Sequence, residues 1–278
     1  MATYTSTTGA DALLPEDTAS LVTIPTLAAS VFARVTTTKV TRAHDFRIPI
    51  VSADPTALWV NEGAEITPSD PTLTELVVTP TKVAALTIIS QELADDSDPD
   101  AANVIGNGIA RDLAKRIDQA AFAGLAAPAA PGLTTLSGVQ TYVNAAAFQN
   151  LDFAAEVVSK LEVVGATCTA FVTSPAVALL LAKLRVITGS LQPLLGPDVT
   201  TPTSRTIQGV PLYVSEFVAA NTLWAIDGSR VWTVMRADAE ITSDRSVFYT
   251  SARVAVRGIA RVGFGFPHAA AVVKVTLA

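Results

Sequence analysis

Charged residues, cysteine and histidine are all scarce in this sequence. Only 16% of the 278 residues are charged, half are hydrophobic, and the mean hydropathy is +0.42. The surface of a monomer in water normally carries more charge than this. Such a composition fits either a membrane protein or a protein whose surface is largely covered by copies of itself.

The sequence also lacks a hydrophobic run long enough to cross a membrane. The longest uncharged apolar stretch, near residues 176–182, is interrupted by Lys183 and Arg185, whereas a spanning helix needs about 20 apolar residues. Residues 1–17 are polar and threonine-rich, without the basic start and apolar core of a signal peptide. We therefore expect no membrane partner, a protein made and kept in the cytosol, and a hydrophobic composition explained by self-association.

Side chains suited to catalysis or metal binding are few. The single cysteine, Cys168, excludes an internal disulfide and a cysteine-based zinc site, and we interpret it as a buried small apolar residue. The two histidines, His44 and His268, limit base catalysis, and no G-x-S-x-G motif is present. We expect no catalytic residue, no cofactor and no metal. A hydrolase on an α+β scaffold remains the alternative from another class.

Clusters of basic residues are missing as well. The net charge is −6 and the isoelectric point is near 4.9. Tight nucleic-acid binding needs clustered Lys and Arg that displace counterions. Direct recognition of DNA or RNA is therefore not expected, although an acidic protein can enclose nucleic acid without binding it tightly.

Among the features that are present, the segment Trp59-Val60-Asn61-Glu62-Gly63-Ala64-Glu65 is the most informative. It continues through Ser69-Asp70-Pro71 into an apolar stretch. We predict a long polar hairpin that returns through residues 73–78 and 83–89. Two strands alone are marginally stable in water, so we expect the hairpin to lie on a neighbouring subunit. Glu62 and Glu65 then form ion pairs across an interface rather than a catalytic carboxylate pair.

The residue pattern in the middle of the chain predicts one long helix over residues 98–124. Its apolar residues recur every four positions, at Ile105, Ile109, Leu113 and Ile117. Gly106 and Gly108 fall within this helix and indicate close helix packing. A break rich in Ala and Pro follows at residues 126–132.

The remaining patterns mix helices and strands without a βαβ rhythm, which is typical of the α+β class. We predict helices over 145–164 and 175–185. We predict strands over 35–51, 169–173, 210–214, 222–226, 231–234, 239–242, 247–258 and 268–277. The late glycines Gly258, Gly263 and Gly265 suggest a bulge or a close backbone approach.

Three segments in order resemble one known family. The first is Trp59–Gly63 with Ser69-Asp70, and the second is residues 82–93, followed by an acidic stretch and the long helix ending at residues 118–124 with Pro131-Gly132-Leu133 beyond it. The third is Phe171-Val172-Thr173-Ser174-Pro175, followed by residues 209–214. Together they resemble the major capsid proteins of tailed bacteriophages, which have the Hong Kong 97-type fold.

The resemblance implies an α+β fold with four parts. These are an N-terminal arm at 1–35, an extended E-loop hairpin at 55–81, a peripheral domain with a long spine helix at 36–54, 82–136 and 236–278, and an axial domain at 137–235. It implies hexamers and pentamers in a shell, with the arm and E-loop reaching neighbouring subunits. The expected assembly contacts in the E-loop are Trp59, Asn61, Glu62, Glu65 and Asp70.

The implied function is that of a major capsid protein in a tailed double-stranded DNA bacteriophage, forming an icosahedral shell around the genome without sequence-specific binding. The implied partners are copies of itself, a separate scaffolding protein, a portal and possible decoration proteins. The virion capsid is the expected location, after assembly in the host cytoplasm. An encapsulin-type nanocompartment is the alternative. No Lys lies between Trp59 and Pro80, so the Lys–Asn crosslink of the type member is not expected.

Overall fold

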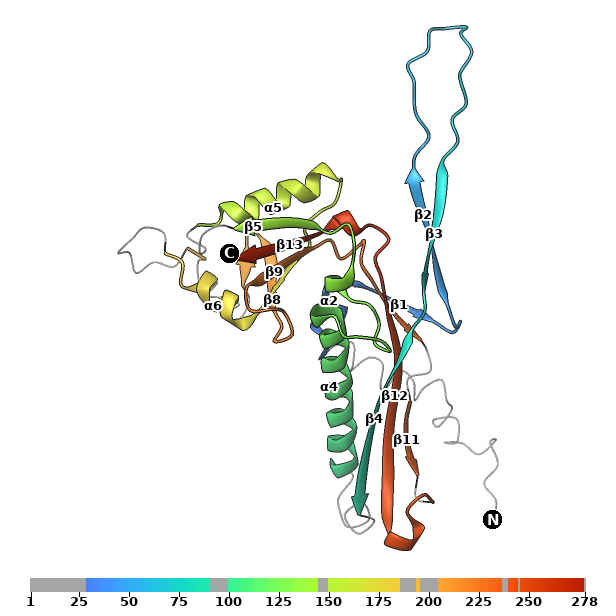
Figure 1. Cartoon of the computed structure of the whole chain (residues 1–278), viewed down its shortest axis with the longest axis vertical. Helices are drawn as coiled ribbons and strands as arrows, with labels where there is room; N and C mark the ends of the chain where they lie inside the picture. The colour runs from blue at the N-terminus through green and yellow to red at the C-terminus, as the bar shows by residue number, and fades with distance from the viewer. Residues whose placement is uncertain are drawn as a thin grey trace.

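The computed structural model describes residues 29–90, 100–144, 150–185, 194–195, 205–236, 240–244 and 246–277. Figure 1 shows an elongated body built around one long helix, a second body beside its upper end, and a hairpin that projects well beyond both. The predicted helix start at residues 97–98, residues 145–149 and most of the predicted loop at 189–205 lie outside the described residues.

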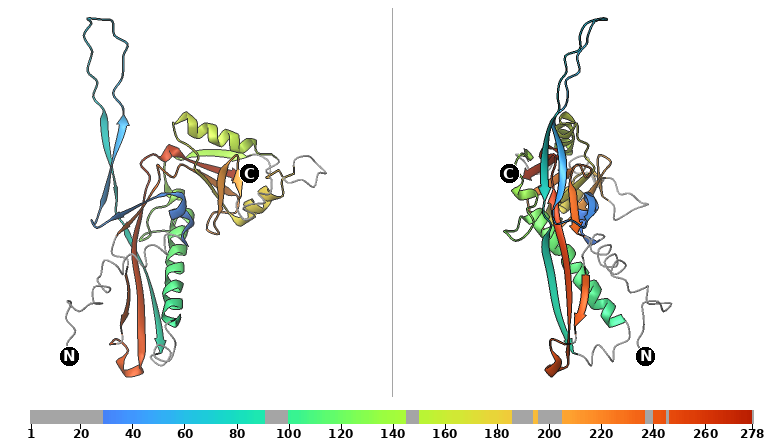
Figure 2. Two further views of the ribbon diagram at one scale, coloured as in Figure 1. Left: turned by 180° about the vertical axis from the view of Figure 1, so that it is seen from behind. Right: turned by 90° about the vertical axis from the view of Figure 1, so that its right-hand side faces the viewer.

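The elongated body contains a five-stranded sheet on which the long helix packs. In this sheet β12 pairs along one edge with β4 and along the other with β10 and β11, and β1 lies beyond β10. The strands are β1 (Thr37–Thr41), β4 (Thr81–Ser90), β10 (Trp232–Arg236), β11 (Glu240–Asp244) and β12 (Arg253–Gly265). Helix α4 (Asp100–Ala123) lies along one face, and the short helix α2 (Val31–Val35) packs beside it (Figure 2).

Strand β12 is the central strand of this sheet, and its two faces differ. Val254, Val256, Ala260, Val262 and Phe264 alternate along the face that meets α4, and they are buried or partly buried there. Gly258 lies on the same face. A Cβ atom at Gly258 would lie 2.4 Å from Cγ2 of Ile109, a separation that real Cβ atoms essentially never show. The missing side chain therefore lets α4 approach the sheet closely.

The second body is a six-stranded sheet covered by helices on one face. Its order is β5, β13, β9, β6, β8, β7. The strands are β5 (Gln140–Asn144), β6 (Ala170–Thr173), β7 (Thr206–Ile207), β8 (Val210–Val214), β9 (Thr222–Ile226) and β13 (Val272–Leu277), and the helices are α5 (Asp152–Val163) and α6 (Pro175–Ala182). One-turn 3-10 helices are η2 (Leu133–Thr135), η3 (Tyr249–Ser251) and η4 (Ala269–Ala271).

The two faces of this second sheet serve two different cores. Phe171, Leu223 and Ala225 pack with α5 and α6. Val172 and Trp224, which alternate with them, pack instead into the core that contains α2, α4 and β12. The period-two alternation of a strand thus joins the two bodies through one shared apolar core.

The projecting hairpin consists of β2 (Phe46–Ala53) and β3 (Thr72–Val78), which pair antiparallel from Phe46–Val78 to Ala53–Thr72 with an irregularity after Val51. Residues 54–71 connect the two strands. The predicted return path is confirmed, because β3 and β4 cover residues 73–78 and 83–89.

Other predicted elements are confirmed with small shifts. The long helix ends at Ala123, strands β8 and β9 fall on the predicted residues, and α6 begins at Pro175, where Ser174 accepts a hydrogen bond from the Val177 amide as its N-cap. That helix ends at Ala182 instead of Arg185. Strand β5 was not predicted, because its five residues Gln-Thr-Tyr-Val-Asn are mostly polar and do not alternate strictly between polar and apolar.

Three predictions need correction. The strand predicted at 247–258 runs instead over Arg253–Gly265, because η3 and the left-handed Ala252 (φ 47°) turn the chain first. Residues 269–271 form η4, so the last strand starts at Val272. Gly106 has no neighbouring atom near an added Cβ, and at Gly108 the nearest is the end of the Arg111 side chain at 4.0 Å. The close helix packing predicted there is therefore wrong within the described chain.

The sheet pairing of two strands bears on the predicted domain division. Strand β10 straddles the predicted boundary between residues 235 and 236 and pairs with β1 and β12, and β13, which falls in the predicted peripheral segment 236–278, pairs with β5 and β9. The reason is topological: the chain crosses between the two sheets after β9 and again after β12.

The close contact at Gly258 leads to a stability prediction. Gly258→Val should destabilise the chain by about 1–3 kcal/mol, because overpacking forces Ile109 or the helix to shift. Gly106→Ala is the matched control and should stabilise by up to about 1 kcal/mol, because its Cβ meets open space on a helix. Urea unfolding followed by circular dichroism measures both. Equal effects of the two substitutions would contradict the close approach of α4 to β12.

Candidate assembly surfaces

The connection between β2 and β3, residues 54–71, makes up most of the E-loop predicted at 55–81 and is exposed at every position. Trp59 is fully exposed, and Ile66 and Leu58 are 74% and 63% exposed. A connection of this length without secondary structure of its own is uncommon in a compact domain and is usually functional or disordered. Large apolar side chains left in water indicate a surface that is covered in the working state of the protein.

Few internal bonds shape this loop. The backbone N–H of Thr56 donates to Oγ of Ser69 at 2.8 Å and so joins the two limbs. At the tip, the Ala64 N–H donates to the Asn61 carbonyl at 3.1 Å, and Gly63 adopts φ +81°. Glycine adopts this left-handed conformation without steric cost. The loop is therefore a preshaped hairpin extension that is not packed on its own body.

The five predicted contact residues all lie on this extension. Trp59 and Asn61 precede the turn, Glu62 lies in it, and Glu65 and Asp70 follow on the returning limb. They share one projecting loop, far from the buried cores (Figure 1). Such a position suits contact with another molecule rather than a cleft for catalysis.

The base of the hairpin is anchored on the face of the main sheet opposite α4. Ile48 and Val78 are 2% and 5% exposed and pack with Val234. A Cβ at Gly263 would lie 2.8 Å from Cγ1 of Val78, and one at Gly265 would lie 2.9 Å from Cδ1 of Ile48. The prediction of a close approach at these late glycines is confirmed, and it is the base of the hairpin that comes close.

Polar contacts complete this anchor. Arg47 and Glu75 form an exposed ion pair across β2 and β3 at 3.3 Å. In the turn before β2, Asp45 accepts hydrogen bonds from Thr79 at 2.7 Å and from His44 at 2.8 Å. The Thr79 bond, followed by that of His44, holds the pKa of Asp45 below its usual value. His44 thus contributes to a structural turn.

A buried carboxylate fixes the point at which residues 1–28 join the described chain. Asp118 of α4 accepts hydrogen bonds from the Ser30 hydroxyl at 2.7 Å and from the Val31 and Phe32 amides at 2.9 Å each. Burial raises the pKa of Asp118, and the three hydrogen bonds partly offset that effect. The carboxylate serves as an external cap for the first amides of α2. Sequence reasoning missed this role because the partners lie 86–88 residues apart.

A second exposed surface, the outer face, was also missed. We define the outer face as Lys82, Ala84, Leu86 and Ile88 of β4 with Arg253, Arg257 and Ile259 of β12, on the side of the sheet opposite α4. Leu86 and Ile88 are 63% and 44% exposed. Strand β4 has apolar residues on both of its faces, and this continuous apolar run is the sequence signal that both faces are meant to be covered.

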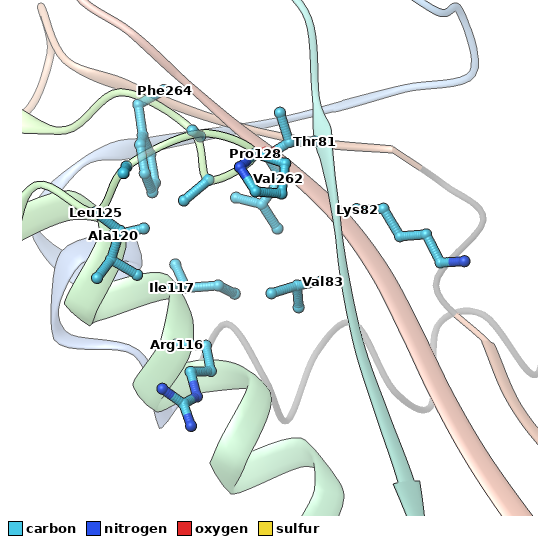
Figure 3. A pocket seen from close by; sticks show the side chains of 13 residues that line it. Thr81, Lys82, Val83, Arg116, Ile117, Ala120, Leu125, Pro128, Val262 and Phe264 are labelled. Atoms are coloured by element: carbon cyan, nitrogen blue, oxygen red, sulfur yellow. The ribbon is translucent and has the colours of Figure 1, made fainter.

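An apolar pocket of about 360 Å³ lies on the other side of the sheet, between α4, the start of β4 and the loop after α4. Ile117, Val83, Val262 and Phe264 line it (Figure 3). The charged ends of Lys82 and Arg116 point away from this space. The pocket therefore has mainly apolar walls, and the Thr81 hydroxyl that also lines it donates to the Val262 carbonyl at 3.3 Å.

The remaining candidates for chemistry are isolated. Cys168 is half-buried, and burial raises the pKa of its thiol to about 12, which suits the predicted inert apolar role. No group of three or more His, Cys, Asp and Glu side chains suited to a metal ion occurs among the residues that the structure describes. None of the helices described is long and apolar enough to cross a membrane.

Comparison with known proteins identifies the class. The sequence matches the model of the Phage capsid family over residues 10–277. A solved chain from Microbacterium phage Oxtober96 is 19% identical, covers 90% of this chain and 91% of its own, and has a TM-score of 0.74. A chain from the capsid of a native GTA particle is 22% identical with 90% of each chain covered and a TM-score of 0.71. For Mycobacterium phage Adephagia the values are 18%, 90% of each chain and 0.71. No curated protein matches.

The chain therefore belongs to the phage capsid family, and its α+β fold is of the Hong Kong 97 type. This family defines a class of structural proteins, the major capsid subunits that assemble with copies of themselves into an icosahedral shell. The chain is such a subunit and a component of the virion capsid. The encapsulin alternative is not favoured, because the matching family and the similar structures are capsids of phages and of a gene-transfer particle.

The carboxylate of Asp118 gives a second stability prediction. Asp118→Ala should cost about 2–4 kcal/mol, because three hydrogen bonds to a buried carboxyl group are lost and the buried Phe32 amide and part-buried Val31 amide are left without that acceptor. Asp112→Ala, an exposed position on the same helix, should stay within about 0.5 kcal/mol. Urea unfolding and amide hydrogen exchange at Val31 and Phe32 measure the difference. Unchanged exchange in Asp118→Ala would contradict the capping role.

The close approach of Gly265 to Ile48 at the base of the hairpin gives a third stability prediction. Gly265→Val should displace Ile48 and loosen the hairpin from the sheet, at a cost of about 1–3 kcal/mol. Limited proteolysis of the unassembled chain should then cut within residues 46–78 faster than in the wild type. Thr242→Val, on the exposed strand β11 of the same sheet, is the control and should leave the cleavage rate unchanged. Equal rates in all three proteins would show that the glycine does not hold the hairpin.

Proposed function

We propose that this chain is the major capsid protein of a tailed double-stranded DNA bacteriophage and forms the hexamers and pentamers of its shell. The observation that carries the proposal is the family match over residues 10–277, together with a projecting loop whose largest apolar side chains are uncovered in the single chain. Each subunit would bury this loop against a neighbour. Association then removes apolar area from water, which is the main driving force of assembly.

The charge of the chain suits a container for DNA. At a net charge of −6, the shell would enclose the genome by geometry and would not bind it through phosphate contacts or base readout. A shell that must release its DNA gains little from binding it tightly. The function proposed is structural, without a catalytic step.

Several partners follow from this proposal. A separate scaffolding protein would direct assembly in the host cytoplasm, a portal would occupy one vertex, and decoration proteins would add contacts from outside. No Lys lies between Trp59 and Pro80, so the proposed shell depends on noncovalent contacts. Interfaces of ordinary size bury about 1,600 Å², and each subunit touches several neighbours, so weak single contacts give a stable closed shell.

The proposed division of labour follows the four parts of the chain. The arm was predicted at residues 1–35, but Ser30–Val35 pack beside α4, so we assign the arm role to the residues before Ser30. Residues 55–81 act as the E-loop. The sheet around β12 with α4 forms the peripheral domain. The six-stranded sheet, now including β13, forms the axial domain at the centre of each hexamer or pentamer.

Removal of the loop tests the proposal. Trp59→Ala, or deletion of residues 61–70, should abolish assembly, while the unfolding midpoint stays within error of the wild type because the loop is exposed throughout. Size-exclusion chromatography and negative-stain electron microscopy of the protein made with its scaffolding protein measure shell formation. Val247→Ala, another exposed apolar position at 64% exposure, is the control.

Normal shells from the deletion variant would refute the role of the loop. A wild-type chain that stays monomeric with its scaffolding protein present would refute the capsid function itself. Packaged DNA inside the particles would support the phage proposal, and a protein cargo would support a nanocompartment instead.

A further inference from the structure

The apolar pocket beside the C-terminal half of α4 opens to solvent in the described chain. Ile117, Val262 and Phe264 of its wall are buried, whereas Leu125 at its mouth is 36% exposed. An apolar cavity of about 150 Å³ already holds a benzene molecule, so the 360 Å³ of this pocket has room for two aliphatic side chains. An apolar hollow of this size indicates a surface that another segment covers.

The start of the described chain lies next to this pocket. Phe32 of α2 meets the ring of Phe264 edge-on, with the ring centroids 4.9 Å apart, and Phe264 is a wall of the pocket. Two residues earlier, the hydroxyl of Ser30 donates to Asp118 of α4 at 2.7 Å. Residues 1–28 therefore join the described chain within a few residues of a pocket wall.

The junction and the pocket lie on opposite sides of α4. Asp118 is two residues from Arg116 and from Ala120, which both line the pocket. Because the helix has about 3.6 residues per turn, two positions differ by a little more than half a turn. Lys115 and Gln119 lie between them, on the side of α4 that faces away from the sheet. A helix is about 10–12 Å across, so half its girth is roughly 17 Å, which about five extended residues span.

The sequence before the junction suits such a route. Residues 21–27 read Leu-Val-Thr-Ile-Pro-Thr-Leu. Pro25 disfavours a helical conformation at Ile24, so an extended segment is expected. In an extended segment Val22 and Ile24 point to the same side. Residues 25–29 separate this pair from the anchored junction, and five residues are the length that the route around α4 requires.

The charge of the arm fits the far rim of the pocket. Residues 1–28 contain no Lys or Arg, and Glu16 and Asp17 precede Val22 by six and five positions. A segment that crosses α4 and enters the pocket continues toward β4, where Lys82 is the one charged residue. The ammonium of Lys82 points out of the pocket (Figure 3), so a carboxylate meets it outside the apolar walls. Opposite charges at the edge of a contact favour pairing and fix its register.

We propose that in the free chain the pocket receives the chain's own N-terminal arm, with Val22 and Ile24 inside it. Asp17 then lies near Lys82 at the far rim. Burial of the two side chains removes apolar area from water, and the contact has a high effective concentration because both surfaces belong to one chain. The inference concerns the subunit before assembly and does not rest on the proposed function. In that state the arm is held on its own body and withheld from neighbouring subunits.

Disulfide trapping tests the contact. Val22→Cys, Thr23→Cys or Ile24→Cys is combined in turn with Leu125→Cys, in a chain that also carries Cys168→Ala. Mild oxidation of the dilute free chain should link at least one of the three pairs in more than half of the molecules. The product should run as a monomer on a non-reducing gel, and peptide mass spectrometry should identify the linked pair.

The matched control is Val22→Cys with Val247→Cys. Val247 is exposed and precedes β12, at the end of the sheet away from Phe264, so this pair should link at most one tenth as often. Linked dimers whose share rises with protein concentration would assign the pocket to the arm of a second copy and overturn the proposal. Linkage no higher than that of the control overturns it as well.

Uncovering of the pocket is a separate measurement. Val22→Asp with Ile24→Asp should raise the emission of the apolar dye ANS at least threefold, because a carboxylate does not enter an apolar pocket. Leu13→Asp with Leu14→Asp makes the same change in the arm outside the proposed contact and should leave the emission unchanged. Circular dichroism checks that each chain is folded. Equal emission from the two variants overturns the proposal. Wild-type emission that falls at least threefold when scaffolding protein is added assigns the pocket to that protein instead.

Charge reversal tests the direction of the segment. Glu16→Lys with Asp17→Lys should lower the linked fraction at least twofold, and Lys82→Glu should restore it. Arg111→Glu changes a cation on the exposed side of α4 and should restore nothing. Restoration by Arg111→Glu and not by Lys82→Glu would place the acidic residues along α4 and overturn the proposed direction.

The outcomes separate this contact from the proposed function. None of these measurements requires a shell, so failure of the arm to link leaves the capsid function standing. A wild-type chain that links its arm but forms no shells with its scaffolding protein leaves the arm contact standing and refutes the capsid function.

Discussion

The arrangement of this molecule depends on the close packing of both faces of β12. The strand pairs with β4 on one edge and with β10 and β11 on the other. Gly258 brings Ile109 of α4 against one face, and Gly263 and Gly265 bring Val78 and Ile48 against the opposite face. A side chain at any of these three positions would push out either the long helix or the hairpin. The packing along β12 thus fixes the long helix, the sheet and the base of the hairpin relative to one another. The direction in which the loop projects is therefore set by β12, although the loop itself lies far from the core.

This anchoring explains how an exposed hairpin can have a defined direction. Two strands with no further partner are marginal in water, but here the first pairs of the hairpin are part of a buried cluster with Val234. Beyond residue 53 the loop has only a few internal hydrogen bonds and no apolar core. The single chain therefore closes its own cores and leaves Trp59, Leu86 and Ile88 exposed to solvent.

Much of this fold could be predicted from sequence, and the failures have physical causes. The four-residue recurrence of Ile109, Leu113 and Ile117 correctly identified the long helix, and the proline-flanked hairpin and its return strand were found from turn residues.

Asp118 was missed because its three donors are far away in sequence. The start of β12 was misplaced because the pattern around Val247 alternates as a strand does, while η3 and the left-handed Ala252 turn the chain there. The strand β13 was grouped with its sequence neighbours, although pairing with β9 decides its sheet. The outer face could not be predicted, because Arg253 and Arg257 come beside Leu86 and Ile88 only through the pairing of β4 with β12.

Strand β4 has a consequence for the fate of subunits before they assemble. Within the residues that the structure describes, its ten residues pair on one edge only, with β12. Between Thr81 and Ser90 it has no proline, and Lys82 is its one charged residue. Natural proteins usually protect a long open edge with charge, proline or a bulge. A population of free subunits thus has two competing outcomes, ordered closure into particles or strand-to-strand addition into aggregates. The fraction of the synthesised chain that ends in shells therefore depends on how fast subunits associate into shells. It also depends on any protein that binds free subunits before they assemble.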